Sequence, residues 1–491
     1  MKNITLLIII ISSFTGCKKW LDVQPSDQIV DKELFSESLG FRHSLNGVYI
    51  QAAGKDLFGK NLSWGLNTAY SQEYAAGKMG TEQYLAYEFD KTNAGSQAII
   101  DGIWSRAYNN IANCNKLLKE IESLPESGFM AGRSERNLIM GEAIAMRALM
   151  HFEMLRLYAP APAKEPNGKY LPYVNTYPAK LNPPIATTAV IDQITADLEK
   201  AQSLVAENDT IVNSSGLSAK LPSQIAGLGN GSPLTAFFTF RMHRLNYAAI
   251  HGLLARVYLY AGNYVKAKQE AKYLYENFGP HGRLKWWEFT SEFNATTGSV
   301  NRYSKLANDI LFAAYDADLI TNLAASNQGS YRLSPDVSEW FPASDRDFRS
   351  GFISEAQTDN ETQKGKITDK WLESRAIQAE VKAQNTIVPV LRMSEVYYIY
   401  SETLFREGQK TEALEVLNQV RNARGKLSTF SQTDEESYYQ ELLAEYRREF
   451  INEGQTFFAY KRMQRNLMRG TQTIVLDNRF VLPIPQNEQI F

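Results

Sequence analysis

The sequence predicts a mostly α-helical fold in which pairs of helices repeat along the chain, joined by long irregular insertions and a few short strands. Three observations predict it. Apolar residues recur at helical spacing over much of the chain from Leu34 onward. Small and aromatic residues return at matching offsets around glycine turns in several segments. Between these segments lie long stretches that lack the repeat, so the scaffold is not a uniform solenoid.

The clearest helix pair is predicted at 247–277, with its turn at Gly262. Small and aromatic residues stand where the two helices cross closely, namely Ala255, Tyr258, Tyr264, Ala267, Ala271 and Leu274. Three further pairs are predicted at about 104–158, 390–424 and 441–465. Any one of them could be an ordinary helical hairpin. Because several share one spacing, the sequence favours a tetratricopeptide-like repeat.

Three long segments interrupt the repeats, at 54–97, 158–233 and 279–384. The second is rich in proline, glycine, serine and asparagine, which favour turns. Long irregular segments on a rigid scaffold usually carry function, so we expect the insertions to carry the specificity of the protein. Short strands are predicted near the C-terminus at 473–476 and 479–482.

The first residues have the pattern of a secretory signal. Lys2 precedes an apolar run at 6–11, and small residues lead to Gly16 and Cys17. A membrane-spanning helix needs about 20 apolar residues, and this run is much shorter. The sequence therefore predicts a signal peptide at 1–16, with a junction before Cys17 that is similar to a bacterial lipobox.

Acylation of Cys17 would anchor the chain to a membrane through lipid rather than through a spanning helix. On this interpretation, 17–30 is a lipidated tether and 31–491 is a single domain. The alternative is an ordinary secretory peptide with a chance cysteine. The second cysteine, Cys114, stands on an apolar face of a predicted helix, where we expect an inert buried thiol and no disulfide.

Charge and motifs argue against several classes of function. Lysine plus arginine (52) nearly equal aspartate plus glutamate (54), so no broad positive field exists to bind nucleic acid. None of the five histidines forms the closely spaced pair of a zinc hydrolase, and nucleophile-elbow and phosphate-loop motifs are absent. The glycines at 227, 229 and 231 lack the last glycine of a dinucleotide-binding motif. The sequence predicts no enzyme, no cofactor and no metal site.

Motifs that are spread along the chain resemble those of one family. They are Trp20-Leu21-Asp22 after Cys17, Arg147-Ala148, Pro389-Val390-Leu391-Arg392, Ser394-Glu395-Val396, Arg447-Arg448-Glu449-Phe450 and Leu482-Pro483-Ile484-Pro485. On these residues the chain resembles the SusD/RagB family of Bacteroidetes outer-membrane lipoproteins, from Cys17 to the C-terminus. Gln455 and Thr456 depart from the family pattern, which affects packing details more than class.

The charged residues of these motifs could be catalytic groups or structural pairs. We predict that they form structural ion pairs, because neighbouring helical residues of opposite charge commonly stabilise helix ends and turns. The expected partners of Arg392 are Glu395 or Glu402. The expected partner of Arg447 is Glu453.

The resemblance implies that the chain captures a nutrient, with a glycan as the expected ligand, on the outer face of the outer membrane. It also implies a partner, a SusC-like TonB-dependent transporter that receives the ligand. Sugar rings need flat aromatic side chains for stacking and polar side chains for hydrogen bonds. Members of the family place such residues in the first and third insertions. The ligand-binding candidates are Tyr84, Tyr87, Asn93, Trp286, Asn294, Tyr331 and Arg332.

Two nearby tryptophans, Trp287 and Trp340, are interpreted as core residues because apolar neighbours flank them. Three other functions stay open at this point. The chain could be a peptide-capturing member of the same family, or a repeat module that binds proteins and no small ligand. It could also be a surface glycosidase, since 54 acidic residues leave room for an unrecognised pair of carboxylates.

Overall fold

The computed structural model describes seven main stretches of the chain and a few isolated positions between them. The stretches are 32–75, 81–212, 241–296, 304–326, 331–356, 364–373 and 382–488. The predicted signal peptide, Cys17 and the tether at 17–30 lie outside the described residues, as does the glycine run at 227–231. No helix within the described stretches combines the length and the apolar character needed to cross a lipid bilayer.

In the part of the chain that the structure describes, four helical hairpins form most of the scaffold, and the mostly α-helical prediction is confirmed. They are α6 (Ala94–Glu120) with α7 (Gly132–Tyr158), α12 (Tyr247–Tyr260) with α13 (Tyr264–Asn277), α17 (Met393–Arg406) with α18 (Lys410–Ala423), and α19 (Glu435–Glu449) with α20 (Thr456–Met463). Gly262, Gly408 and Gly454 at three of the turns have positive φ of 79°, 83° and 74°, a backbone conformation that glycine adopts without strain.

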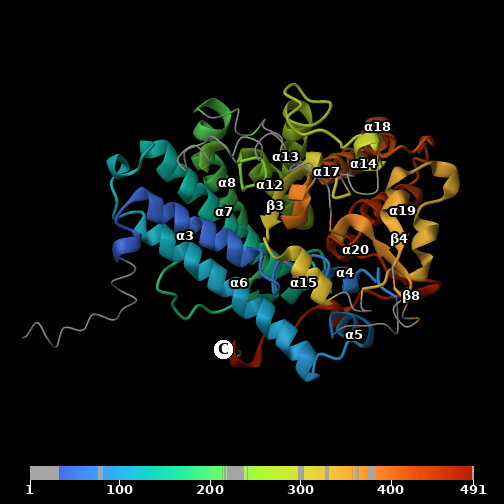
Figure 1. The fold of residues 1–491 in the computed structure, drawn as a ribbon, viewed down its shortest axis with the longest axis horizontal. Helices are drawn as coiled ribbons and strands as arrows, with labels where there is room; N and C mark the ends of the chain where they lie inside the picture. Colours follow the sequence, from blue (N-terminus) through green and yellow to red (C-terminus); the bar gives the residue numbers. More distant parts are fainter. Residues whose placement is uncertain are drawn as a thin grey trace, which may run out of the picture.

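Each helix of the scaffold packs on the next, from α6 and α7 through α12 and α13 to α17 and α18. Figure 1 shows α3 (Ser38–Ala52), α6, α7 and α8 (Thr187–Glu207) side by side at one end of the molecule, and the C-terminal helices at the other. The first insertion contributes two short helices, α4 (Leu66–Tyr70) and α5 (Thr81–Glu88). Since α4 contacts α20, this insertion lies against the last hairpin.

The second insertion is more regular than its composition predicts. It contains α8 (Thr187–Glu207), which packs against both α7 and α12. The helix buries an apolar stripe at helical spacing, made of Val190, Ile194, Leu198, Ala201 and Val205. The prediction of an irregular segment was therefore wrong over this range, because the turn-forming residues lie outside the helix and hid its amphipathic pattern.

Within the described stretches, the strands form four separate antiparallel pairs. They are β1 (Lys169–Leu171) with β2 (Ile185–Ala186), β3 (Ile310–Tyr315) with β6 (Ile387–Arg392), β4 (Ile353–Glu355) with β5 (Lys366–Thr368), and β7 (Leu467–Arg469) with β8 (Gln472–Ile474). The third insertion also holds the short helices α14 (Glu292–Thr296) and α15 (Leu319–Ser326). The predicted strand at 473–476 overlaps β8.

A predicted strand and a predicted helix start in the C-terminal part of the chain were wrong. The predicted strand at 479–482 begins instead as a 3-10 turn at Asn478–Phe480, capped by the Asp477 side chain, which accepts from the backbone N–H of Arg479. The helix pair predicted from 390 begins at Met393, because the preceding residues continue β6 to pair with β3.

A large group of buried charges joins β6, α18, α19 and the third insertion, and we call it the ion-pair cluster. Its members are Asp309, Asp347, Arg349, Lys370, Arg392, Arg424, Glu445, Arg448, Glu449 and Glu453. Arg392 pairs with Glu453 (Nη2 to Oε1, 2.6 Å) and with Asp309 (Nη1 to Oδ1, 2.9 Å). The cluster therefore connects segments that are far apart in the sequence.

The structural interpretation of the motif charges is confirmed, but the predicted partners were wrong. Glu395 pairs with Arg256 (2.5 Å), and Glu402 pairs with Arg462 (2.6 Å), each between a carboxylate oxygen and a guanidinium nitrogen. Arg447 lies over the ring of Trp340, with 4.0 Å from its guanidinium carbon to the ring centre. The partners differ because these pairs join separate helices, and spacing along one helix does not reveal them.

Candidate functional site

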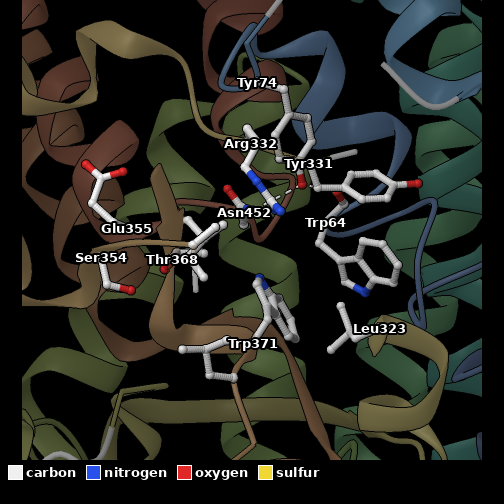
Figure 2. A pocket seen from close by; sticks show the side chains of 13 residues that line it. Trp64, Tyr74, Leu323, Tyr331, Arg332, Ser354, Glu355, Thr368, Trp371 and Asn452 are labelled. Carbon is white, nitrogen blue, oxygen red and sulfur yellow. Dashed lines mark hydrogen bonds between the residues drawn. The ribbon is translucent and has the colours of Figure 1, made fainter. Parts of the chain in front are cut away.

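The first and third insertions meet at a cavity of about 280 Å³, which we call the aromatic cavity (Figure 2). Its lining residues are Trp64 and Tyr74 from the first insertion, Leu323, Tyr331, Arg332, Ser354, Glu355, Ala356, Ile367, Thr368, Trp371 and Leu372 from the third, and Asn452 between α19 and α20. Three separate parts of the chain therefore form one cavity.

Backbone hydrogen bonds hold these parts together. The N–H of Ala75 donates to the carbonyl of Arg332 (2.7 Å), and the N–H of Ser334 donates to the carbonyl of Glu73 (2.7 Å). On the other side, the N–H of Leu333 donates to the carbonyl of Lys366 at the start of β5 (2.8 Å). The segment that carries Tyr331 and Arg332 is thus fixed between both insertions rather than free to move as a loop.

Aromatic rings form much of the cavity wall. The ring centre of Tyr331 lies 5.2 Å from that of Trp64 and 5.4 Å from that of Tyr74, both edge to face, a favourable arrangement of aromatic pairs. The hydroxyl of Tyr331 donates to Glu82 Oε2 (2.9 Å), and Glu82 is also paired with Lys60 (2.6 Å). Both Trp64 and Tyr331 are buried, so they form an enclosed wall rather than an open stacking platform.

Two buried polar atoms that belong to lining residues have no hydrogen-bond partner among the described residues. They are the indole nitrogen Nε1 of Trp371 and the amide oxygen Oδ1 of Asn452. Trp371 is 6% exposed and Asn452 is 4% exposed. Figure 2 shows the indole nitrogen of Trp371 directed toward Asn452 and Arg332. Buried polar groups in proteins are nearly always paired, so such a pair of atoms in a cavity indicates a place for a ligand.

Charged groups of opposite sign also line the cavity. Arg332 is buried, which lowers the pKa of its guanidinium below the usual value, although an arginine remains charged at neutral pH. Glu355 is exposed, and so is Leu372, and we assign the mouth of the cavity to these two residues. The described part of the lining therefore carries one positive and one negative side chain, whose charges cancel.

The structure brings two of the predicted ligand residues, Tyr331 and Arg332, into this cavity. The other described candidates lie elsewhere. Asn93 is exposed and caps α6, its Oδ1 accepting from the N–H of Gly95 (2.8 Å). Trp286 is half-buried and packs on Phe278, with 5.1 Å between ring centres.

Asn294 lies on α14, half-buried and away from the cavity lining. Tyr84 and Tyr87 fall on α5, and their side chains lie outside the described residues. The interpretation of Trp287 and Trp340 as core residues is confirmed, since both are buried.

Sequence reasoning missed Trp64, Tyr74, Trp371 and Asn452. A weak signal existed for Asn452, which stands in an Asn-Glu-Gly turn and adopts a positive φ of 56°, a conformation that asparagine tolerates better than most residues. No periodic pattern marks Trp64 or Trp371 as ligand residues, because only the folded chain places them together.

A second cavity of about 560 Å³ lies between α6, the segment after β1 and the C-terminal residues, with Trp104, Tyr108 and Tyr170 in its wall. It is larger, but none of its lining residues has a buried polar side-chain atom without a partner among the described residues. Within those residues, no three His, Cys, Asp or Glu side chains gather so as to hold a metal ion. The aromatic cavity is therefore the stronger candidate site.

Comparison with known proteins places this architecture in a family. A model described as "SusD family" matches residues 343–488, and a model described as "Starch-binding associating with outer membrane" matches residues 19–226. No protein in the curated set matches the chain.

Solved structures share the fold. A SusD superfamily protein from Bacteroides thetaiotaomicron is 20% identical, with a TM-score of 0.69 over 92% of this chain and 97% of that one. A SusD-like carbohydrate binding protein from Bacteroides vulgatus is 18% identical, with a TM-score of 0.68 over 92% and 96% of the two chains. A SusD superfamily protein from Bacteroides fragilis is 18% identical, with a TM-score of 0.63 over 93% and 98%. By both family models and by its fold, the chain belongs to the SusD/RagB family.

Proposed function

We propose that the chain is a carbohydrate-binding protein of the outer membrane, which captures an oligosaccharide in the aromatic cavity and passes it to a SusC-like TonB-dependent transporter. The observation that carries this proposal is the cavity itself, where two insertions and the turn after α19 bring together four aromatic residues and two polar atoms that have no partner among the described residues. The starch-binding description of one matching family and the carbohydrate-binding relative from Bacteroides vulgatus support the same class of ligand.

The cavity has the chemistry that a sugar requires. Sugar rings present C–H faces that pack on aromatic and apolar walls, and hydroxyls that need both donors and acceptors. Trp64, Tyr74, Tyr331 and Trp371 supply the walls. Small-molecule sites usually combine such apolar walls with a few fixed polar groups.

The lining favours binding over hydrolysis. Glycoside hydrolysis in most families uses a pair of carboxyl groups that flank the scissile bond. Among the described residues that line the aromatic cavity, Glu355 is the single acidic one. A capture role without chemistry on the ligand is therefore the simpler proposal for this site.

Membrane attachment and delivery complete the proposal. Acylation at Cys17 would hold the protein on the outer membrane, and the one domain from residue 31 would reach the ligand outside the cell. Tyr84, Tyr87, Asn93, Trp286 and Asn294 remain candidates for contacts with parts of the glycan that extend beyond the cavity. Ligand transfer to the transporter requires that the two proteins form a complex.

Retention on immobilised polysaccharides tests the capture function. The wild-type protein is expected to bind at least one neutral polysaccharide, such as starch, xylan or mannan, and to leave it uncleaved when the products are analysed by chromatography. Replacement of Trp371 and Tyr331 together by alanine is expected to abolish retention. Release of shorter sugars by the wild-type protein would indicate a glycosidase instead, and retention of peptides but of no glycan would indicate a peptide-binding member.

Purification from detergent-solubilised outer membranes tests the proposed lipid anchor and the proposed transporter partner. Mass spectrometry of the intact protein should show an acylated Cys17, and a TonB-dependent barrel should be recovered with it in a defined ratio. The replacement Cys17→Ser should release the protein from the membrane while the binding of polysaccharide stays unchanged. An unmodified thiol at Cys17 would contradict the proposed anchor.

A further inference from the structure

We infer that the aromatic cavity holds one uncharged terminal unit of a glycan chain and binds a hydroxyl of that unit between Trp371 Nε1 and Asn452 Oδ1. The inference rests on the proposed carbohydrate-binding function and deepens it, because it states which part of the glycan is recognised and what charge it carries. Two buried polar groups, the geometry of the cavity and its size support it.

The orientation of the Asn452 amide is fixed by its neighbours. The hydroxyl of Tyr74 has one proton, which it donates to the backbone carbonyl of Trp64, so toward Asn452 this hydroxyl can only accept. Asn452 Nδ2 donates to it (3.1 Å). The backbone N–H of Asn452 donates to Glu73 Oε2 (2.8 Å). With the nitrogen side of the amide held in this way, Oδ1 is the amide atom that has no partner among the described residues.

The indole of Trp371 is fixed as well. Lys305 Nζ lies 4.9 Å from the centre of its ring, and Lys305 is held in turn by hydrogen bonds to the carbonyls of Gln384 and Ile387. An indole N–H can only donate, and an amide oxygen can only accept. Trp371 and Asn452 therefore offer the cavity one donor and one acceptor, and neither atom has a partner among the described residues.

A hydroxyl group meets both requirements, because it accepts from the indole N–H and donates to the amide oxygen. A carboxylate only accepts, so it would leave its negative charge against Asn452 Oδ1. An ammonium group only donates and would leave the indole N–H unpaired. Among the described lining residues the charges of Arg332 and Glu355 are opposite, so together they do not favour a charged sugar.

The size of the cavity limits how much of the glycan can enter. At about 280 Å³ it lies just below the range of roughly 300–1,000 Å³ that is typical of pockets for drug-sized ligands. Most of its wall is buried, and the exposed lining residues are Glu355 and Leu372. One sugar unit can enter past these two residues, and the chain attached to it must leave by the same mouth.

Calorimetric titration of the full-length protein with linear hexasaccharides tests the inference. The probes are malto-, xylo- and mannohexaose, with hexagalacturonate as the charged probe. A neutral hexasaccharide is expected to bind, and hexagalacturonate is expected to bind at least roughly tenfold more weakly. For the hexasaccharide that binds best, methyl ethers on the hydroxyls of one terminal unit are expected to weaken binding roughly tenfold, whereas methyl ethers on the central units are tolerated.

Two variants test which protein groups bind the sugar hydroxyl, and a third serves as their control. Trp371→Phe keeps an aromatic ring and removes the donor. Asn452→Gly removes the acceptor at a positive φ that glycine adopts readily. Both are expected to weaken binding of the best hexasaccharide roughly tenfold. The control Trp340→Phe changes a tryptophan of similar burial outside the cavity, and it is expected to bind within about twofold of the wild type.

The outcomes separate the inference from the proposed function. If the wild type binds a neutral hexasaccharide and both Trp371→Phe and Asn452→Gly bind it equally well, the inference is overturned and carbohydrate binding stands. Tighter binding of hexagalacturonate, or equal tolerance of methyl ethers at both ends, also overturns it. If no polysaccharide and no hexasaccharide binds, the proposed function itself is wrong. The methylated probes need only the wild-type protein, so the test holds even if a variant does not fold.

Discussion

The ion-pair cluster and the aromatic cavity are neighbours, yet each charged side chain of the cluster has a partner of opposite sign, whereas two residues that line the cavity have a polar atom without a partner among the described residues. Lys370 and Glu453 belong to the cluster and pair with each other (Nζ to Oε1, 2.9 Å). The residues next to them in sequence, Trp371 and Asn452, line the cavity and each has a buried polar atom without a partner among the described residues. The cluster therefore stabilises the scaffold, whereas the cavity is arranged for a molecule that is not part of the protein.

This comparison teaches that buried charge by itself is a poor marker of function. Burial alone would raise the pKa of Glu445, but the charges of Arg349 and Arg448 outweigh it and hold that pKa well below the usual range. Such a carboxylate stays ionised and paired, which suits a structural role. Unmet hydrogen-bonding capacity in a cavity is the more specific signal.

The largest expected effect comes from breaking the cluster. Arg392→Met removes the cation that pairs with both Glu453 and Asp309, and it leaves buried negative charge uncompensated. The free energy of unfolding, measured by urea denaturation, is expected to fall by roughly 3–5 kcal/mol. The control Arg479→Met breaks an exposed pair with Asp477 and is expected to cost less than about 1 kcal/mol. Equal losses in the two variants would show that burial does not distinguish these pairs.

A smaller effect is expected at the cavity wall. Tyr331→Phe removes the hydroxyl that donates to Glu82, while Lys60 still pairs with that carboxylate. A loss of roughly 1.5 kcal/mol in the free energy of unfolding is expected, near the lower end for hydrogen bonds to charged groups. The exposed Tyr315 is the matched control, since Tyr315→Phe should leave stability unchanged. A wild-type melting curve for Tyr331→Phe would mean that this hydrogen bond does not form.

Lys305 touches both regions, because its ammonium lies over Trp371 and its carbonyl accepts from Arg392. Burial lowers the pKa of Lys305 to about 7. Between pH 7 and about 10, Lys305 is protonated in the unfolded chain and neutral in the folded chain. The free energy of unfolding should therefore rise with pH in this window, by roughly 1.4 kcal/mol per pH unit from this group. Lys305→Met should lower that slope, as measured by urea denaturation at several pH values. An unchanged slope would contradict the lowered pKa.

The smallest expected effect is the most informative about the cavity. In the absence of ligand, Trp371→Phe should change the free energy of unfolding by less than about 1 kcal/mol, because the indole N–H makes no hydrogen bond with the described protein. The buried Trp287 is the matched comparison, since its N–H donates to the carbonyl of Ile310 (2.9 Å). Trp287→Phe should therefore cost roughly 1–3 kcal/mol. If thermal unfolding shows the same loss for both, the indole of Trp371 is paired within the protein.

Local patterns in the sequence predicted local structure well. The spacing around Gly262 located α12 and α13, and the apolar surroundings of Cys114 predicted a buried thiol, whose pKa burial raises to about 12. The helix α8 was missed because residues that favour turns flank it. The repeated helix pairs can therefore be predicted from the sequence. A helix inside an insertion is missed when the surrounding composition favours turns.

Contacts between distant segments could not be predicted from one sequence. Arg392 pairs with Glu453 rather than with Glu395 or Glu402 on the helix that follows it, because the fold brings β6 against the turn after α19. In the same way, Tyr331 and Arg332 were identified from composition and family likeness, whereas Trp371 and Asn452 become a site only when two insertions and that turn meet. Trp371 in the third insertion would donate to the proposed ligand hydroxyl, and Asn452 in the turn after α19 would accept from it.

A crystal structure of the protein with its best-binding neutral hexasaccharide tests the central claim most directly. A terminal sugar unit is expected inside the aromatic cavity, with one hydroxyl oxygen about 2.7–3.2 Å from both Trp371 Nε1 and Asn452 Oδ1. A hexasaccharide bound in the second cavity beside Trp104 and Tyr108, with the aromatic cavity left empty, would contradict it.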